Sequence, residues 1–116
     1  MGAALQGDLF ATAAPALPPG IALLRGHFGP ADSRGLLDDM ADVLAAAPPY
    51  RLRLKSGAFM INRLTNCGAL GWHSDEKGYR YIDRHPGTGA PWPPIPARLK
   101  QAAIAAAEAC GVAGFD

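Results

Sequence analysis

TNCGALGW at residues 65–72 and GYRY at residues 78–81 are the most informative stretches of this chain of 116 residues. Their glycines permit tight bends of the backbone. Such bends present Trp72, Tyr79 and Tyr81 as flat, partly polar faces, a combination that suits the stacking of a nucleobase. An ordinary hydrophobic core does not need this arrangement. The two stretches therefore predict a structured aromatic surface.

A β-hairpin is expected immediately before the glycine-rich stretch. Apolar and basic residues alternate over residues 50–55, which places Leu52 and Leu54 on one face of a predicted strand and basic side chains on the other. Residues 59–65 have the pattern of a second strand. Ser56-Gly57 between them is typical of a turn, so the two strands should pair.

The glycine-rich stretch itself should leave this hairpin as a structured loop. Residues 79–82 have the composition of a further short strand. Residues 86–96 contain five prolines around Trp92, which predicts an extended connector without regular structure. We expect Trp92 to be structural and to clamp the connector onto the sheet.

Two helices are expected outside this central region. Pro30 suits the first turn of a helix, Asp32 lies near the positive end of its dipole, and Pro48-Pro49 ends it. A second helix should occupy residues 96–110, with Gly111 placed to terminate it. The apolar positions of the first helix recur at helical spacing and are Leu36, Leu37, Met40, Val43, Leu44 and Ala47.

The N-terminal stretch has a different composition. Residues 1–19 are rich in Ala, Pro and Gly, which predicts a mobile leader pinned through Leu9 and Phe10, ahead of a single unit at residues 20–116. Residues 21–24 are a short apolar run between glycines, which favours a buried strand. The leader has neither the basic start nor the long apolar run of a signal or membrane segment, so no membrane association is expected.

Composition excludes some classes of protein and localises the charge. With 49% hydrophobic residues, 18% charged residues and a net charge of +1, the chain is neither disordered nor strongly basic. Residues 50–84 nevertheless hold seven of the 11 basic, three of the 10 acidic and five of the nine aromatic residues. This mixture suits a single strand or a flipped nucleotide, while a solvated sheet face over an aromatic core explains it equally well. Cys67 and Cys110 lack metal-binding spacing, which indicates a reduced, cytoplasmic protein.

The sequence resembles the AlkB-type DNA dealkylating dioxygenases, most specifically at residues 65–72, at residues 78–81 and at Pro91-Trp92-Pro93. The resemblance extends from residues 8–10 to the final helix. It implies an α+β fold, namely the N-terminal helices and the lid hairpin of a double-stranded β-helix, or jelly-roll, with the jelly-roll core largely missing. In that family the lid holds an alkylated base flipped out of its strand.

The resemblance also implies substrate-binding roles for five residues. Trp72 would be the wall on which the base stacks, and Met60 an apolar contact beneath it, although a plain core role suits a methionine in an alternating strand equally well. Tyr79, Arg80 and Tyr81 would hold the backbone of the strand near the lesion. A cationic base such as 1-methyladenine or 3-methylcytosine would gain about 1 kcal/mol or more from contact with a ring.

His73-Ser74-Asp75 has the H-x-D spacing of the iron site in this enzyme class. We do not assign it to iron, because in the resembling family that motif lies downstream of the lid, whereas here it directly follows Trp72. A third ligand would have to be His85 or His27, and His85 lies in a connector with no rigid element to aim it. His73 is therefore expected to be a surface loop histidine.

The resemblance implies Fe(II) and 2-oxoglutarate as cofactors of the complete enzyme, which would oxidise the methyl group and release formaldehyde. Neither cofactor is expected to bind this chain, and no residue is assigned a catalytic or metal-binding role. The expected partners of a monomeric chain are alkylated DNA, single-stranded or duplex, or RNA. Two alternatives stay open: a stand-alone module that binds single-stranded nucleic acid without catalysis, and an incomplete product whose apolar face lacks its partner sheet.

Overall fold

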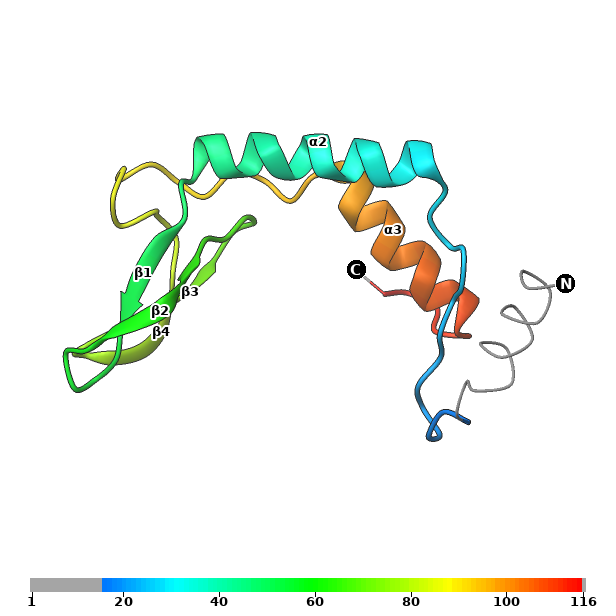
Figure 1. Cartoon of the computed structure of the whole chain (residues 1–116), viewed down its shortest axis with the longest axis horizontal. Helices are drawn as coiled ribbons and strands as arrows, with labels where there is room; N and C mark the ends of the chain where they lie inside the picture. The colour runs from blue at the N-terminus through cyan, green and yellow to red at the C-terminus, as the bar shows by residue number, and fades with distance from the viewer. Residues whose placement is uncertain (1–15, 116) are drawn as a thin grey trace, which may run out of the picture.

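The computed structural model describes residues 16–115, which form two helices and two separate hairpins arranged as an open arch (Figure 1). One helix runs along the top of the arch, both hairpins lie below one end, and the second helix lies below the other end. The elements are α2 (Pro30–Ala46), β1 (Tyr50–Arg53), β2 (Phe59–Leu64), β3 (Gly71–Asp75), β4 (Gly78–Ile82) and α3 (Ala97–Ala109).

Helix α2 confirms the clearest sequence prediction. Its first turn is closed by a hydrogen bond in which the Gly29 amide donates to Asp32 Oδ2 over 3.2 Å, so the acidic side chain satisfies one of the free amides at the helix start. At the other end the Ala47 amide donates to the Val43 carbonyl over 2.8 Å. Val43 and Ala47 are buried there, at the junction with the hairpins.

The predicted pair of strands forms one two-stranded antiparallel sheet, and a second such sheet pairs β4, the expected short strand, with β3, which was not expected as a strand. Strands β1 and β2 confirm the expected hairpin, with an irregular register between Arg51 and Arg53. The first strand ends earlier than predicted, because the Gly57 amide donates to the Leu54 carbonyl over 2.8 Å and so begins the turn. Leu54 is consequently 38% exposed instead of facing the core beside the buried Leu52.

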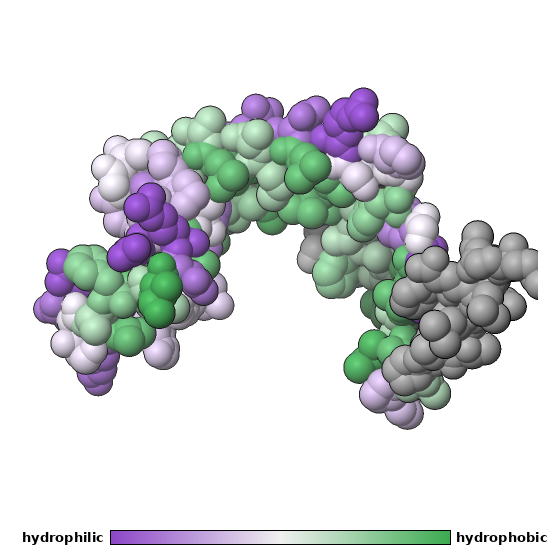
Figure 2. Space-filling model, viewed as in Figure 1, coloured by the Kyte–Doolittle hydropathy of each residue, from purple (hydrophilic) through white to green (hydrophobic). Residues whose placement is uncertain are grey.

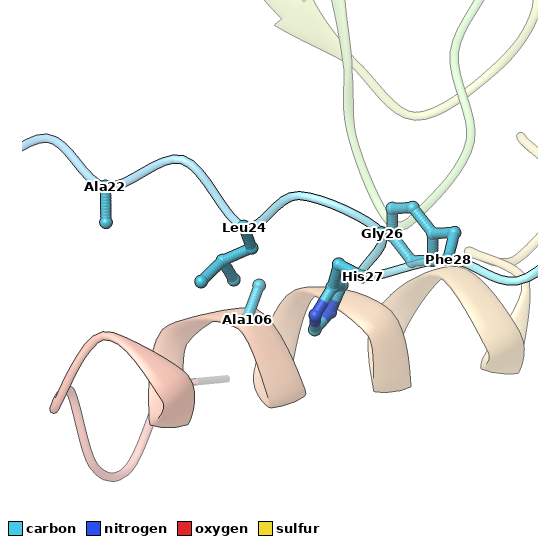
Figure 3. Close-up of a pocket in the computed structure, with 6 residues that line it drawn as sticks. All are labelled: Ala22, Leu24, Gly26, His27, Phe28 and Ala106. Carbon is cyan, nitrogen blue, oxygen red and sulfur yellow. The ribbon is translucent and has the colours of Figure 1, made fainter. Parts of the chain in front are cut away.

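The predicted strand at residues 21–24 is wrong. The run lies between two turns, in which the Ile21 amide donates to the Pro18 carbonyl and the His27 amide to the Leu24 carbonyl, and it has no partner strand within residues 16–115. Ala22 and Leu24 instead face α3, where they line a hollow of about 410 Å³ with Ala106 (Figure 3), while Ile21 and Leu23 are exposed. Most of the predicted leader, including Leu9 and Phe10, lies outside the described residues.

The hydrophobic core of residues 16–115 is small. Buried apolar side chains are confined to Val43, Ala47, Leu52 and Trp92, and three polar side chains are buried with them. The radius of gyration is 19.1 Å, against about 13 Å for a compact domain of this length. Figure 2 shows the apolar side of α2 lining the inside of the arch. None of the described helices is long and apolar enough to cross a membrane.

Candidate functional site

An aromatic face lies on the β3–β4 hairpin. In this regular ladder Trp72 is opposite Tyr81 and Ser74 is opposite Tyr79, so all four side chains emerge on one face. The rings of Trp72 and Tyr79 approach diagonally, with centroids 5.5 Å apart and planes tilted by 40°. Tyr79 and Tyr81 are 72% and 68% exposed. Three of the five predicted site residues are thereby brought together on one face, where Trp72 is half-buried beside the two exposed tyrosines.

The loop at residues 65–70 fixes the position of Trp72. The side-chain amide of Asn66 accepts a hydrogen bond from the Trp72 amide and donates one to the Trp72 carbonyl, both over 3.2 Å. Asn66 thus satisfies the backbone of Trp72 as a neighbouring strand would. Thr65 Oγ1 donates to the Ala47 carbonyl over 2.7 Å, which ties the loop to the end of α2. The expected loop forms, although Gly71 and Trp72 already belong to β3.

The three stretches that carry the family resemblance meet in space. The Gly68 amide donates to the Pro93 carbonyl over 2.7 Å, and the positive φ of Gly68 at this point favours glycine. Gly71 lies so close to Trp92 that an added Cβ would be 2.7 Å from its ring. Trp92 Nε1 in turn donates to the Ile82 carbonyl over 2.7 Å. The structural role predicted for Trp92 is confirmed by these contacts.

Arg80 emerges on the opposite face of the hairpin from Tyr79 and Tyr81. Its guanidinium donates to both carboxylate oxygens of Asp75, over 2.7 and 2.6 Å. Together with the Lys77 amide, this guanidinium holds the pKa of Asp75 well below its usual range. Arg80 remains 41% exposed, but its charge is shared with a carboxylate.

Met60 does not belong to the hairpin that carries the aromatic face. It lies on β2, in the other two-stranded sheet, and is partly exposed. Nearby on the same hairpin, the Arg53 guanidinium sits 4.2 Å above the centre of the Phe59 ring and 3.5 Å from Glu76 Oε1. The first hairpin therefore adds a cationic and apolar surface to the aromatic surface of the second.

The expectation that His73 is a surface loop residue is wrong. It lies in β3 and is only 9% exposed, because its ring packs against Tyr50. Tyr50 Oη and His73 Nδ1 are 3.1 Å apart, and His73 Nε2 lies 3.4 Å from Asp75 Oδ2. Neither the run of polar residues after Trp72 nor the distant Tyr50 gave a local signal of a buried strand here.

The H-x-D residues do not fit an iron site. The Asp75 carboxylate is engaged by Arg80, and His73 Nδ1 by Tyr50. His85, the candidate third ligand, is 3% exposed and has both ring nitrogens in hydrogen bonds, with the Pro48 carbonyl and with the amides of Gly87 and Thr88. The His85 ring is therefore held rigidly, contrary to expectation, but by hydrogen bonds that have a structural role. Residues 16–115 contain no cluster of three or more potential metal ligands.

Comparison with known proteins gives consistent matches. A sequence profile of the 2OG-Fe(II) oxygenase superfamily matches residues 20–116. The alpha-ketoglutarate-dependent dioxygenase AlkB of Salmonella typhimurium is 40% identical over 112 residues, which cover 94% of this chain and 51% of that protein. AlkB of Escherichia coli is 35% identical over 113 residues, with the same coverage of both chains.

An AlkB homologue from Caulobacter vibrioides is 40% identical over 81 residues, which cover 70% of this chain and 37% of that protein. The chain thus spans about half the length of the two AlkB proteins. The superfamily match covers most of the chain and the relatives share one type. The chain therefore belongs to the 2OG-Fe(II) oxygenase superfamily and, within it, to the AlkB-type dioxygenases.

Proposed function

We propose that this chain is the N-terminal substrate-recognition portion of an AlkB-type enzyme that oxidatively demethylates bases of the 1-methyladenine and 3-methylcytosine type in DNA or RNA. The observation that carries the proposal is the exposed aromatic face of the β3–β4 hairpin, held in place by the three stretches at residues 65–72, 78–81 and 91–93. A contiguous exposed aromatic patch of this kind is typical of a surface that binds a ligand or a partner.

Each proposed contact uses a property of its side chain. Trp72 offers its ring to the flipped base, and its backbone is fixed by Asn66. Tyr79 and Tyr81 expose phenols that donate hydrogen bonds to phosphate oxygens. Met60, from the first hairpin, supplies an apolar contact. Arg80 lies on the opposite face and is paired with Asp75, so we propose that it contributes only long-range attraction for the phosphates.

Charge favours an alkylated base over an ordinary one. A base methylated at its pairing edge carries a positive charge, which is attracted to the electron-rich face of an aromatic ring. The surrounding basic residues of the span 50–84 attract the phosphates at the same time. The surface therefore combines general attraction for the strand with selectivity for the damaged base.

Fe(II) and 2-oxoglutarate would supply the oxidation in the complete family enzyme. The residues described here do not fit the metal, so we propose that its ligands come from the jelly-roll portion of the complete fold. The apolar inside of the arch supports this arrangement (Figure 2). Part of it is a hollow of about 570 Å³ between α2 and the loop at residues 65–70, lined by Met40, Val43, Leu44, Thr65, Asn66 and Cys67. We propose that the jelly-roll packs against this surface.

Binding to a labelled single-stranded oligonucleotide tests the proposal. The dissociation constant is measured by fluorescence anisotropy for an oligonucleotide with one 1-methyladenine and for the same sequence unmodified. We expect tighter binding of the methylated strand. Trp72→Ala should weaken it by between about fivefold and about a hundredfold, because stacking contributes about 1–3 kcal/mol per base.

Phe28→Ala is the matched control, since Phe28 is also an exposed aromatic residue but lies beside α3. It should leave the affinity unchanged. Equal losses in both variants, or equal affinity of the wild type for both oligonucleotides, would contradict the proposed role of Trp72. Tight but unselective binding would favour a general single-strand module instead.

A further inference from the structure

The two hairpins touch along β1 and β3 but form separate sheets, with no backbone ladder between those strands. Side chains make the connections that the structure describes between them. Ser74 Oγ donates to the Arg53 carbonyl over 2.6 Å, and Tyr50 meets His73. A third link, between Arg53 and Glu76 at 3.5 Å, is solvent-exposed and correspondingly weak. The angle between the hairpins therefore depends on a few buried side chains.

The hydrogen bonds around His73 have a consistent direction. Burial raises the pKa of the Tyr50 phenol, so the phenol stays protonated and can donate to His73 Nδ1. With Nδ1 as the acceptor, the ring donates from Nε2, which faces Asp75 Oδ2 at 3.4 Å. Asp75 is itself fixed by Arg80. The imidazole thus connects Tyr50 at the start of β1 to the paired charges on the second hairpin.

This connection joins the two parts of the surface proposed above. Met60 belongs to the first hairpin, whereas Trp72, Tyr79 and Tyr81 belong to the second. We propose that His73 is a positioning residue that holds the aromatic face of β3–β4 at a fixed angle to the β1–β2 hairpin through its hydrogen bond with Tyr50. The fixed angle between the hairpins is inferred from the contacts alone. Its effect on nucleic-acid binding rests on the proposed function.

The hydroxyl of Tyr50 can be separated from the packing of its ring. The Tyr50 ring also packs against His85 and Trp92, with centroids 5.1 and 6.4 Å away. Tyr50→Phe therefore removes the link to His73 and keeps the aromatic cluster. The same logic applies at residue 73. An asparagine places an amide group near the position of Nδ1, whereas a glutamine places one near Nε2 and lacks the group that meets Tyr50.

Residual dipolar couplings of backbone amides in the 116-residue chain measure the hairpin angle directly. We expect the couplings of both wild-type hairpins to fit one alignment tensor. Tyr50→Phe and His73→Gln should require a separate tensor for each hairpin, and His73→Asn should restore the single-tensor fit. Glu76→Gln, which breaks only the exposed link, should behave as the wild type.

Two tensors in the wild type, or one tensor in all variants, would overturn the proposal. So would loss of the folded amide spectrum in Tyr50→Phe, because a single hydroxyl would then support the whole core instead of setting an angle. Failure of the single-tensor fit to return in His73→Asn would also count against it.

The affinity for the 1-methyladenine oligonucleotide is measured on the same samples. We expect Tyr50→Phe and His73→Gln to weaken it severalfold and His73→Asn to recover most of the loss. If the couplings change as expected but the wild type does not bind the oligonucleotide, the proposed function fails and the hairpin link stands. If the wild type binds selectively and the couplings never change, the link fails and the function stands.

Discussion

Asn66 gives Trp72 the two backbone hydrogen bonds that an adjacent strand would otherwise supply. The asparagine that precedes the glycines therefore pairs the backbone of Trp72, a role that the sequence pattern alone does not reveal. An asparagine in a turn usually forms hydrogen bonds with nearby backbone groups. Here the partner lies six residues away in sequence, so neither asparagine nor tryptophan signals the contact by itself.

We predict that Asn66→Ala destabilises the chain by about 1–3 kcal/mol, because a partly buried amide and carbonyl lose their partners. Urea unfolding followed by circular dichroism measures the change. Asn62→Ala is the matched control, since Asn62 is exposed on β2 and should alter the free energy of unfolding little. Equal effects of the two substitutions would show that the Asn66 side chain does not hold Trp72.

Asp75 should make stability depend on pH in a definite direction. Its folded pKa is lowered by Arg80 and the Lys77 amide, so its contribution is fully present above the unfolded value of about 3.9. That contribution is lost as the pH falls through the folded pKa, because the unfolded chain binds the proton first. Wild type and Asp75→Asn should therefore differ by a constant amount above about pH 5 and converge in more acidic solution.

The free energies of unfolding of both proteins are measured by urea titration across that pH range. Glu76→Gln serves as the control, because the neighbouring Glu76 is 64% exposed and makes only a 3.5 Å ion pair. A difference between wild type and Asp75→Asn that does not shrink in acid would contradict the assigned ion pair.

At the scale of elements, periodic segments were predictable and segments that depend on distant partners were not. Helix α2 and strands β1, β2 and β4 carry their patterns in their own residues, whereas the residues of β3 carry no such pattern and were expected in a loop. The apolar run at residues 21–24 has the composition of a strand, but a strand needs a partner that the described residues do not offer. The burial of His73 was not predictable either, because it comes from packing against Tyr50, 23 residues earlier in the sequence.

Gly71 tests how tightly the loop, β3 and the connector pack. A Cβ at this position would lie 2.6 Å from Asn66 and 2.7 Å from the Trp92 ring. We predict that Gly71→Ala lowers the free energy of unfolding by about 1–3 kcal/mol, as overpacking does elsewhere. Gly29→Ala is the control, because its nearest neighbour would be at an ordinary 3.7 Å.

Differential scanning calorimetry of the two glycine variants compares them under the same conditions. A clearly larger fall of the midpoint is expected for Gly71→Ala than for Gly29→Ala, which loses only the preference for glycine over alanine at a helix start. An unchanged midpoint for Gly71→Ala would mean that Asn66 and Trp92 are not in close contact with β3.

At the scale of the whole molecule, the open arch and its small core agree with a chain that spans about half the length of the AlkB proteins it matches. Apolar side chains such as Ile61, which is 90% exposed, have little to pack against within residues 16–115. The family was recognisable from the sequence because three stretches carry specific motifs, and the structure brings these stretches into one cluster of contacts. The angle between the hairpins was not predictable from the sequence, because it depends on side chains of both hairpins.

The most direct test of the central claim is the proton resonance of the methyl group in a 1-methyladenine oligonucleotide titrated with this chain. A base stacked on the Trp72 ring places its methyl group in the ring current of the indole. We predict an upfield shift of that resonance on binding, absent for Trp72→Ala. Binding that leaves the methyl resonance in place, or an identical shift with Trp72→Ala, would contradict the account.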